Sequence, residues 1–170
     1  ISDTCTPQGV LCVLKQFHYN IEEMLRDKAP LFLLLENIQD PGNLGTMLRT
    51  GEGAGVSGII MSRDTVDLYN PKVIRSTMGS IYRVPFYYAD DFAAAVHQVQ
   101  QAGVSVYAAH LRGKNSYACQ DYTKGTAFLI GNEGNGLREE TAELADCYIR
   151  IPMEGKVESL NAAVASSILM

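Results

Sequence analysis

Short hydrophobic runs alternate with longer amphipathic stretches along almost the whole chain. Several runs are nearly continuous in hydrophobicity, as expected for strands covered by helices on both faces. They predict strands at residues 10–17, 31–36, 58–62, 83–88, 104–109, 126–131 and 147–152. The stretches between them predict helices at about residues 42–54, 71–78, 91–102, 136–145 and 158–170. This alternation predicts an α/β fold with a mostly parallel sheet and helices on both faces.

Three glycines, Gly53, Gly55 and Gly58, have the G-x-G-x-x-G spacing of a dinucleotide-binding loop. Such a loop follows a strand and opens a helix, so that the helix N-terminus faces the pyrophosphate. Here a helical pattern precedes Gly53 and a strand pattern follows Gly58, so the order is reversed. We interpret Gly53 and Gly55 as the helix end and a tight turn, which argues against an NAD-dependent oxidoreductase.

Composition narrows the class of protein. The chain has 170 residues, enough for one domain with a hydrophobic core, and no apolar run of the roughly 20 residues that cross a membrane. Its net charge of −5 argues against broad electrostatic binding of nucleic acid, although a local basic patch or a further domain would supply such binding.

The cysteines Cys5, Cys12, Cys119 and Cys147 lie far apart. We therefore expect reduced thiols in a cytoplasmic protein, with no metal site.

Three polar stretches carry residues that packing and turn formation alone do not require. In "ENIQDPGNLGTMLRT" (36–50), Asp40 can cap a helix, and Arg49 lies off the apolar face of that helix. The alternative without a functional role is a capped helix whose arginine is solvated. In "FLIGNEGNGL" (128–137), a strand runs into a glycine-rich loop and a helix, although tight-turn geometry explains the glycines but not Glu133. In "IRIPMEGKVESLNAAVASS" (149–167), a short strand precedes a helix of small residues, which Ser159 could cap.

Together these stretches resemble motifs one, two and three of the SpoU-type (TrmH-like) RNA ribose methyltransferases of the SPOUT superfamily. Motif one is matched by Asn37, Asp40, Pro41, Asn43, Gly45 and Arg49. Motif two is matched by Gly131, Glu133, Gly134 and Gly136. Motif three is matched by Ile151, Pro152, Met153, Ser159, Leu160 and Asn161. The order and spacing fit over roughly residues 30–170.

The resemblance implies a deep trefoil knot at the C-terminal end of the sheet, with S-adenosylmethionine bent into the knot loops. No metal is implied, because the sulfonium of that cofactor is already activated. The cofactor-binding residues implied by the resemblance are Ala109, Leu111, Gly131, Asn132, Ile151, Pro152, Met153 and Leu160.

The resemblance also implies transfer of a methyl group to a ribose 2′-hydroxyl of structured RNA, either rRNA or tRNA. Arg49 matches the catalytic arginine of the family, and we expect it to clamp phosphate and orient the hydroxyl rather than act as a base. Asn37, Glu133, Ser159 and Asn161 match positions that shape the site. The resemblance further implies a homodimer. A non-catalytic RNA- or nucleotide-binding module of the same fold is the alternative.

We expect residues 1–29 to connect the catalytic domain, residues 30–170, to a preceding RNA-binding domain absent from this chain. The chain begins with Ile1 and stops within a helical pattern, so both ends look cut.

Overall fold

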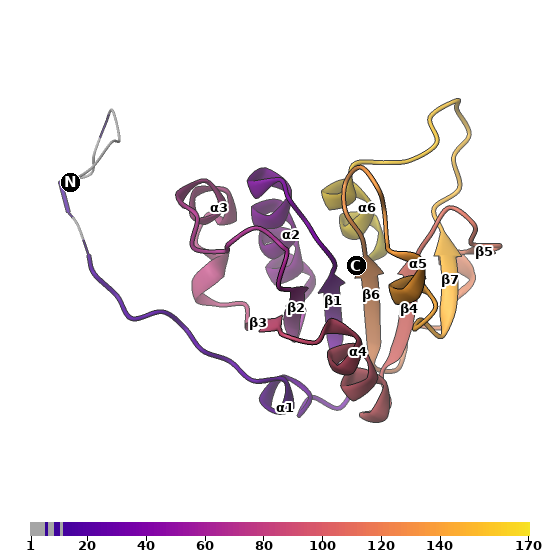
Figure 1. Ribbon diagram of the computed structural model, residues 1–170, viewed down its shortest axis with the longest axis horizontal. Coiled ribbons are helices and arrows are strands. Elements are labelled where there is room, and N and C mark those ends of the chain that lie inside the picture. The colour runs from indigo at the N-terminus through magenta and orange to yellow at the C-terminus, as the bar shows by residue number, and fades with distance from the viewer. Residues whose placement is uncertain (1–5, 7–8, 11) are drawn as a thin grey trace.

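A single parallel sheet forms the centre of the molecule in the computed structural model, which describes residue 6, residues 9–10 and residues 12–170 (Figure 1). The strand order is β3-β2-β1-β6-β4-β7-β5, and all the pairings between these strands are parallel. The strands are β1 (Leu31–Leu35), β2 (Gly58–Ser62), β3 (Phe86–Ala89), β4 (Ser105–Ala109), β5 (Asn115–Ser116), β6 (Thr126–Ile130) and β7 (Cys147–Arg150). The prediction of a mostly parallel α/β sheet is confirmed.

Helices cover both faces of the sheet. They are α1 (Ile21–Met24), α2 (Pro41–Ala54), α3 (Pro71–Thr77), α4 (Phe92–Gln101), α5 (Glu139–Ala142) and α6 (Ala162–Leu169), with short 3₁₀ helices η1 (Ser80–Tyr82) and η2 (Tyr117–Cys119). Buried residues of α2, α3 and α6 belong to one core cluster, whereas those of α1, α4 and α5 belong to another. The molecule is therefore a three-layer sandwich.

Strand β1 shows why the hydrophobic runs are continuous. Leu33 and Leu35 pack in the cluster of α2 and α6, and Phe32 and Leu34 pack in the cluster of α4. Each of these side chains is 0% exposed, since alternate residues of a strand point to opposite faces. A strand with two covered faces needs apolar residues at every position, as the sequence indicated.

The order of the strands reverses between β1 and β6. The chain builds β1, β2 and β3 in one direction, and then crosses to β4 on the far side of β6. In open parallel sheets, ligands bind beyond the carboxyl ends of the strands at such a reversal. The loops after β1 and β6 are therefore placed to form a site.

The predicted strand at residues 10–17 is wrong for the residues described there; residue 11 lies outside them. The described residues of this segment form no helix or strand, and the side chains of Val10, Val13 and Leu14 are exposed. Its apolar pattern therefore does not reflect pairing in the sheet. Four short elements, α1, η1, β5 and η2, were not predicted, because elements of two to four residues carry little periodicity.

Two predicted helices are shorter in the structure. Residues 136–145 contain only the single turn of α5, and the last helix begins at Ala162 rather than at residue 158. Asn161 caps this helix, because its side-chain oxygen accepts hydrogen bonds from the backbone N–H groups of Ala163 and Val164. The cap expected at Ser159 is therefore wrong. By contrast, Gly55 ends α2 in a left-handed conformation (φ 76°), which confirms the interpretation of the glycine spacing.

Helices α2 and α3 cross at Gly45. An added Cβ at this position would lie 1.8 Å from Oγ and 2.6 Å from Cβ of Ser76. The Ser76 hydroxyl also donates a hydrogen bond to the carbonyl oxygen of Pro41, at 3.1 Å. Glycine at position 45 thus lets α3 approach the first turns of α2.

We predict that Gly45→Ala destabilises the fold by about 1–3 kcal/mol, because the new methyl group must displace Ser76 and part of α3. Gly53→Ala in the same helix is the matched control, since a Cβ there meets nothing within 4 Å. It should stabilise α2 by about 0.5–1 kcal/mol through helix propensity. Urea unfolding of both variants measures the difference. Equal stabilities of the two variants would contradict the close crossing.

Candidate functional site

The carboxyl ends of β4, β6 and β7 open into one cavity of about 260 Å³. Its walls come from the residues after these strands and from the segment that leads into α6. Of the residues expected to bind cofactor, those that line the cavity are Ala109, Leu111, Gly131, Asn132, Ile151, Met153 and Leu160. Pro152 lies between two lining residues without lining the cavity itself. The structure thus brings together the residues that follow three different strands and the segment that leads into α6.

The glycine-rich loop, residues 131–137, forms one whole wall of the cavity. Its two ends touch, since a Cβ on Gly131 would lie 2.2 Å from the carbonyl carbon of Gly136 and from the nitrogen of Leu137. Asn132 and Gly136 exchange both backbone hydrogen bonds, at 3.0 and 2.9 Å. Gly136 has a positive φ of 70°. The glycines therefore close the neck of the loop and turn the chain back.

The tip of this loop is fixed by Glu133. Its carboxylate accepts hydrogen bonds from the backbone N–H groups of Gln39 (3.1 Å) and Asp40 (3.0 Å), and from the Asn43 amide (3.1 Å). Burial acts to raise the pKa of Glu133, but these hydrogen bonds outweigh it and hold the pKa below its ordinary value. Glu133 is thus an ionised anchor that joins the glycine-rich loop to the amino end of α2.

Asn43 connects this anchor to the last helix. Its amide NH₂ donates to Glu133, and its amide oxygen accepts a hydrogen bond from the NH₂ group of Asn161, at 2.9 Å. The Asn161 oxygen is already occupied in capping α6. The orientations of both amide groups, Asn43 and Asn161, are therefore fixed by their partners. Motifs one, two and three meet at this chain of side chains.

Asn37 lies at the end of β1 in a left-handed conformation, with φ 54°. Asparagine adopts this conformation more readily than most residues. Its N–H donates to the Ser62 hydroxyl (2.8 Å), and its carbonyl oxygen accepts from the Asn132 amide (2.8 Å). Asn37 therefore links the ends of β1, β2 and β6, although it does not line the cavity.

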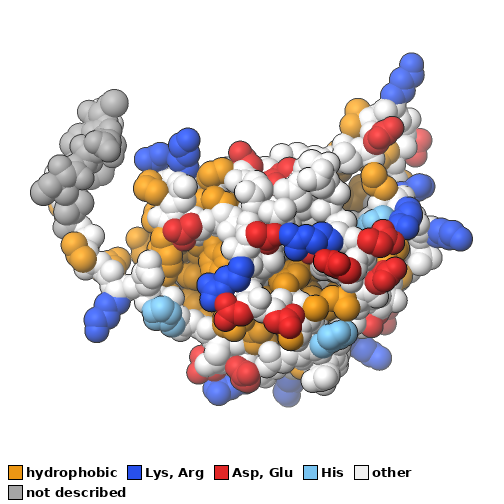
Figure 2. All heavy atoms as spheres, viewed as in Figure 1, with side chains coloured by type: hydrophobic (Ala, Val, Ile, Leu, Met, Phe, Trp, Pro, Cys, Tyr) orange, Lys and Arg blue, Asp and Glu red, His pale blue; other side chains and the backbone are white. Residues whose placement is uncertain are grey.

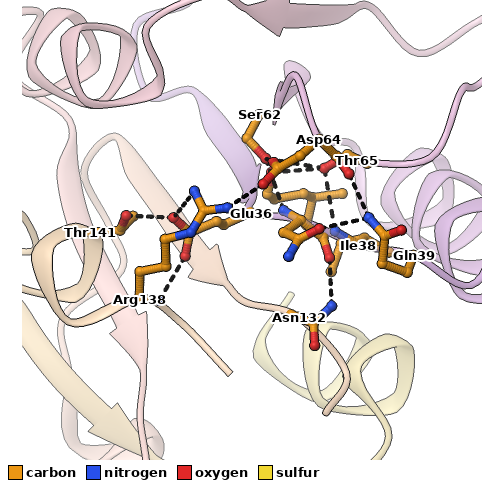
Figure 3. Close-up of polar contacts among 11 residues, drawn as sticks. Glu36, Ile38, Gln39, Ser62, Asp64, Thr65, Asn132, Arg138 and Thr141 are labelled. Atoms are coloured by element: carbon orange, nitrogen blue, oxygen red, sulfur yellow. Dashed lines mark hydrogen bonds and ion pairs between the residues drawn. The ribbon is translucent and has the colours of Figure 1, made fainter. Parts of the chain in front are cut away.

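A buried carboxylate fixes the other end of the glycine-rich loop (Figure 3). Glu36 is 1% exposed, and it accepts hydrogen bonds from the backbone N–H of Arg138 (2.8 Å) and the Thr141 hydroxyl. The Arg138 guanidinium forms ion pairs with Glu36 and Asp64. Burial acts to raise the pKa of Asp64, but hydrogen bonds from Ser62 and Arg138 lower it overall. Arg138 thus joins loops that follow β1, β2 and β6.

The remaining expected site residues are placed differently. Ser159 lines the cavity and is exposed. Arg49 lies on the exposed side of α2, outside the cavity lining, and the five ion pairs found among the described residues do not include it. Asn37 and Asn161 lie behind the lining, where they hold its loops. Within one chain, the structure does not bring Arg49 to the cavity.

Within the described residues, no three His, Cys, Asp or Glu side chains gather in a way that could hold a metal ion. The same part of the chain contains no helix that is long and apolar enough to cross a membrane. Cys12, Cys119 and Cys147 form no disulfide with one another, and Cys5 lies outside the described residues.

The sequence of this chain matches a known protein family over most of the chain's length. Residues 30–170 match the model of the SpoU rRNA methylase family. The chain belongs to this family. A relative at 35% identity over all of this chain is the 23S rRNA (guanosine(2553)-2′-O)-methyltransferase RlmP of Bacillus subtilis, and the chain covers 66% of its length. A 23S rRNA (guanosine-2′-O-)-methyltransferase, RlmB of Neisseria meningitidis, is 30% identical, with 70% of its length covered.

Solved structures of SpoU proteins share the fold. The SpoU methyltransferase AviRb of Streptomyces viridochromogenes, in complex with the cofactor AdoMet, is 28% identical to this chain and superimposes with a TM-score of 0.82. The alignment covers 88% of this chain and 58% of AviRb. This chain therefore spans 58% to 70% of the length of these relatives.

Sequence reasoning gave no role to Asn43, Glu36 or Arg138. Asn43 was part of the first motif, so its position was signalled, but its place between Glu133 and Asn161 was not. Glu36 ends the run "LFLLLE", and a carboxylate directly after a buried strand is a signal for a buried ion pair. Its partner, 102 residues later, carried no signal.

We predict that Glu133→Gln lowers the free energy of unfolding at pH 7 by about 1 kcal/mol, because the amide group turns an N–H towards backbone donors. The folded-state pKa of Glu133 is lowered, so its stabilising effect is present above the ordinary carboxyl pKa of about 4.3 and is lost as the pH falls through the folded value. The gap between the two proteins should therefore narrow as the pH falls below about 4.

Urea unfolding between pH 7 and pH 3 measures this gap. Glu143→Gln, an exposed acidic residue of the same region, is the control and should leave stability unchanged at every pH. A constant gap for Glu133→Gln across the range would show that its ionised form does not anchor the loop.

Proposed function

We propose that this chain is the catalytic part of an S-adenosylmethionine-dependent RNA methyltransferase that modifies a ribose 2′-hydroxyl of rRNA or tRNA. The observation that carries the proposal is that motifs two and three line one cavity at the carboxyl edge of the sheet, while Asn43 of motif one is hydrogen-bonded to both of them. The names of the rRNA-modifying relatives and the cofactor-bound AviRb structure support the reaction and the cofactor.

The cavity fits the cofactor chemically. Ala109, Ile151 and Leu160 offer apolar surface for an adenine ring. The glycine-rich loop brings main chain without bulky side chains to the cavity wall, so a nucleoside can approach it closely. When bound, the cofactor supplies an activated methyl group on its sulfonium, and no metal is needed. The chain's residues have to hold the ribose hydroxyl in line with this methyl group and stabilise the alkoxide that develops.

Glu133 is not suited to take the proton of the hydroxyl. Its two oxygens already accept three hydrogen bonds, and its pKa is lowered, so it is a weak base. We infer that Glu133, Asn37 and Asn161 hold the loops in place. Arg49 is exposed and free to bind an RNA phosphate, and its guanidinium would orient the hydroxyl and stabilise its negative charge.

We also infer a trefoil knot and a homodimer, as the family resemblance implies. The small buried residues Ala162, Ala163 and Ser166 support close threading of α6, which packs against α2 and β6 although β7 lies two strands away from β6. Val164 and Ile168, four residues apart on α6, are 48% and 38% exposed, as expected for a helix that packs on a second copy. Because Arg49 is exposed and lies outside the cavity lining of its own chain, we infer that an active site would combine residues of both protomers.

The catalytic domain would comprise residues 30–170, with residues 1–29 connecting it to an RNA-binding domain in the whole protein. The face shown in Figure 2 supports this division, because Lys and Arg side chains are interspersed there with Asp and Glu side chains. RNA affinity depends largely on uncompensated cations. The cytoplasm, where rRNA and tRNA are modified, would be the place of action.

Transfer of a labelled methyl group from S-adenosylmethionine to total RNA, in the presence of EDTA, tests the function. Mapping of 2′-O-methylation in RNA with and without the gene then identifies the nucleotide. Cofactor and RNA binding without methyl transfer would instead support a non-catalytic binding module. Loss of cofactor binding in EDTA would refute the metal-free site.

We predict that Arg49→Ala abolishes methyl transfer but leaves cofactor affinity within about threefold, which is under ~1 kcal/mol. Arg49 lies outside the cavity lining, so the cofactor does not depend on it within one chain. Arg49→Lys should also be poor, because an ammonium group does not reproduce the bidentate hold of a guanidinium. Arg63→Gln, which removes a cation paired with Asp90, is the control with unchanged activity. More than a tenth of the activity in Arg49→Ala would refute the clamp.

We predict that the chain sediments as a dimer at micromolar concentration. Val164→Asp or Ile168→Asp should shift it towards the 18.6 kDa monomer, because a buried carboxylate opposes the contact. Met78→Asp, which changes an exposed apolar residue of another surface, is the control. A clean monomer in the unmodified protein would rule out the dimer.

A further inference from the structure

Two charged side chains of the cavity have no partner within the described part of the chain. They are Arg150, the last residue of β7, and Glu158, on the segment leading into α6. The five ion pairs found among the described residues include neither of them. Both side chains are exposed, so neither charge needs a protein partner to compensate for burial.

The other titratable side chains of the cavity are already committed. Glu133 accepts three hydrogen bonds from the amino end of α2. His110 accepts a hydrogen bond from the backbone N–H of Arg112 at its Nδ1 atom, which requires the uncharged nitrogen. Burial lowers the pKa of His110, and the neighbouring Arg112 lowers it further against the opposing effect of Glu139. Arg150 and Glu158 are therefore the free charges of this cavity, one of each sign.

Their position marks one end of the cavity. Both residues also line an adjoining hollow of about 410 Å³, together with the apolar side chains of Leu111, Ile151, Met153 and Val157, with Gly155, and with a second cation, Lys156, which does not line the first cavity. The glycine-rich loop lines the first cavity but not the second. Arg150 and Glu158 thus lie where the cavity meets the hollow, and the glycine-rich loop lies on another side of the cavity.

We infer that Arg150 and Glu158 form the subsite for the amino-acid end of the cofactor. This inference rests on the proposed function. S-adenosylmethionine carries a carboxylate and an ammonium group on one carbon, so a zwitterion meets one cation and one anion. The Arg150 guanidinium binds the carboxylate through paired N–H donors, and the Glu158 carboxylate accepts from the ammonium group.

Ligands with and without this amino-acid end test the inference. S-adenosylhomocysteine has the carboxylate and the ammonium group, whereas 5′-methylthioadenosine has the same nucleoside without them. Calorimetry would measure both affinities in the unmodified chain, in Arg150→Gln and in Glu158→Gln. We expect each variant to bind S-adenosylhomocysteine at least about tenfold more weakly, as for loss of a charge-assisted hydrogen bond, and to bind 5′-methylthioadenosine within twofold.

Two further variants exclude simpler explanations. Arg63→Gln removes a cation that lines neither hollow, so it should leave both affinities unchanged and controls for net charge. Arg150→Lys keeps the charge and should restore part of the affinity for S-adenosylhomocysteine. Thermal unfolding confirms that each variant is folded before the ligands are compared.

The possible failures are distinguishable. If the unmodified chain binds neither ligand, the proposed function and this subsite are both refuted. If it binds S-adenosylhomocysteine and the two variants bind it equally well, or lose both ligands in equal measure, the subsite alone is refuted. An effect of Arg150→Gln on the RNA KM with unchanged S-adenosylhomocysteine affinity would also refute it, since Arg150 would then contact RNA phosphate.

Discussion

The contact between the Glu133 carboxylate and the amino end of α2 determines how the motif loops lie. A parallel sheet places the ends of its strands at one edge, but it does not fix the loops that follow them. Here one carboxylate satisfies two backbone N–H groups that precede α2 and an amide group in its first turn. The charge of the loop after β6 and the dipole of the helix after β1 stabilise each other.

Other polar contacts depend on this position. Because Asn43 donates to Glu133, its oxygen is left to accept from Asn161, and the cap of α6 is thereby tied to α2. At the other end of the glycine-rich loop, Glu36 and Arg138 hold the chain where it leaves the cavity wall. The described residues have no buried side-chain nitrogen or oxygen without a hydrogen-bond partner. A network satisfied in this way favours one arrangement of the loops over others.

Much of the fold followed from the sequence, because strand β1 carries apolar residues at every position, its neighbours β2 and β6 do so at most positions, and α2 has a clear cap and end at Asp40 and Gly55. The strand predicted from the apolar residues Val10, Val13 and Leu14 was wrong. An apolar run indicates a surface that favours burial, but it does not identify the element or molecule that covers this surface. The motifs also signalled the loops of the cavity. The contacts of Glu133, Asn43 and Glu36 were hidden, because their partners lie 90 or more residues away along the chain and side-chain pairing at such distances leaves no periodic signal.

The contact between Asn43 and Asn161 also has a consequence for how the protein folds. It joins residues 118 positions apart, and the segment that it secures completes the wall of the cavity. Contacts this distant in sequence require a large loop to close before they stabilise anything, which slows folding. During synthesis, the sheet around β1 and β2 can gather long before the last wall exists. We therefore expect the cavity to form late in folding, since a partly synthesised chain that contains Arg49 and Glu133 still lacks the segment leading into α6 that lines it.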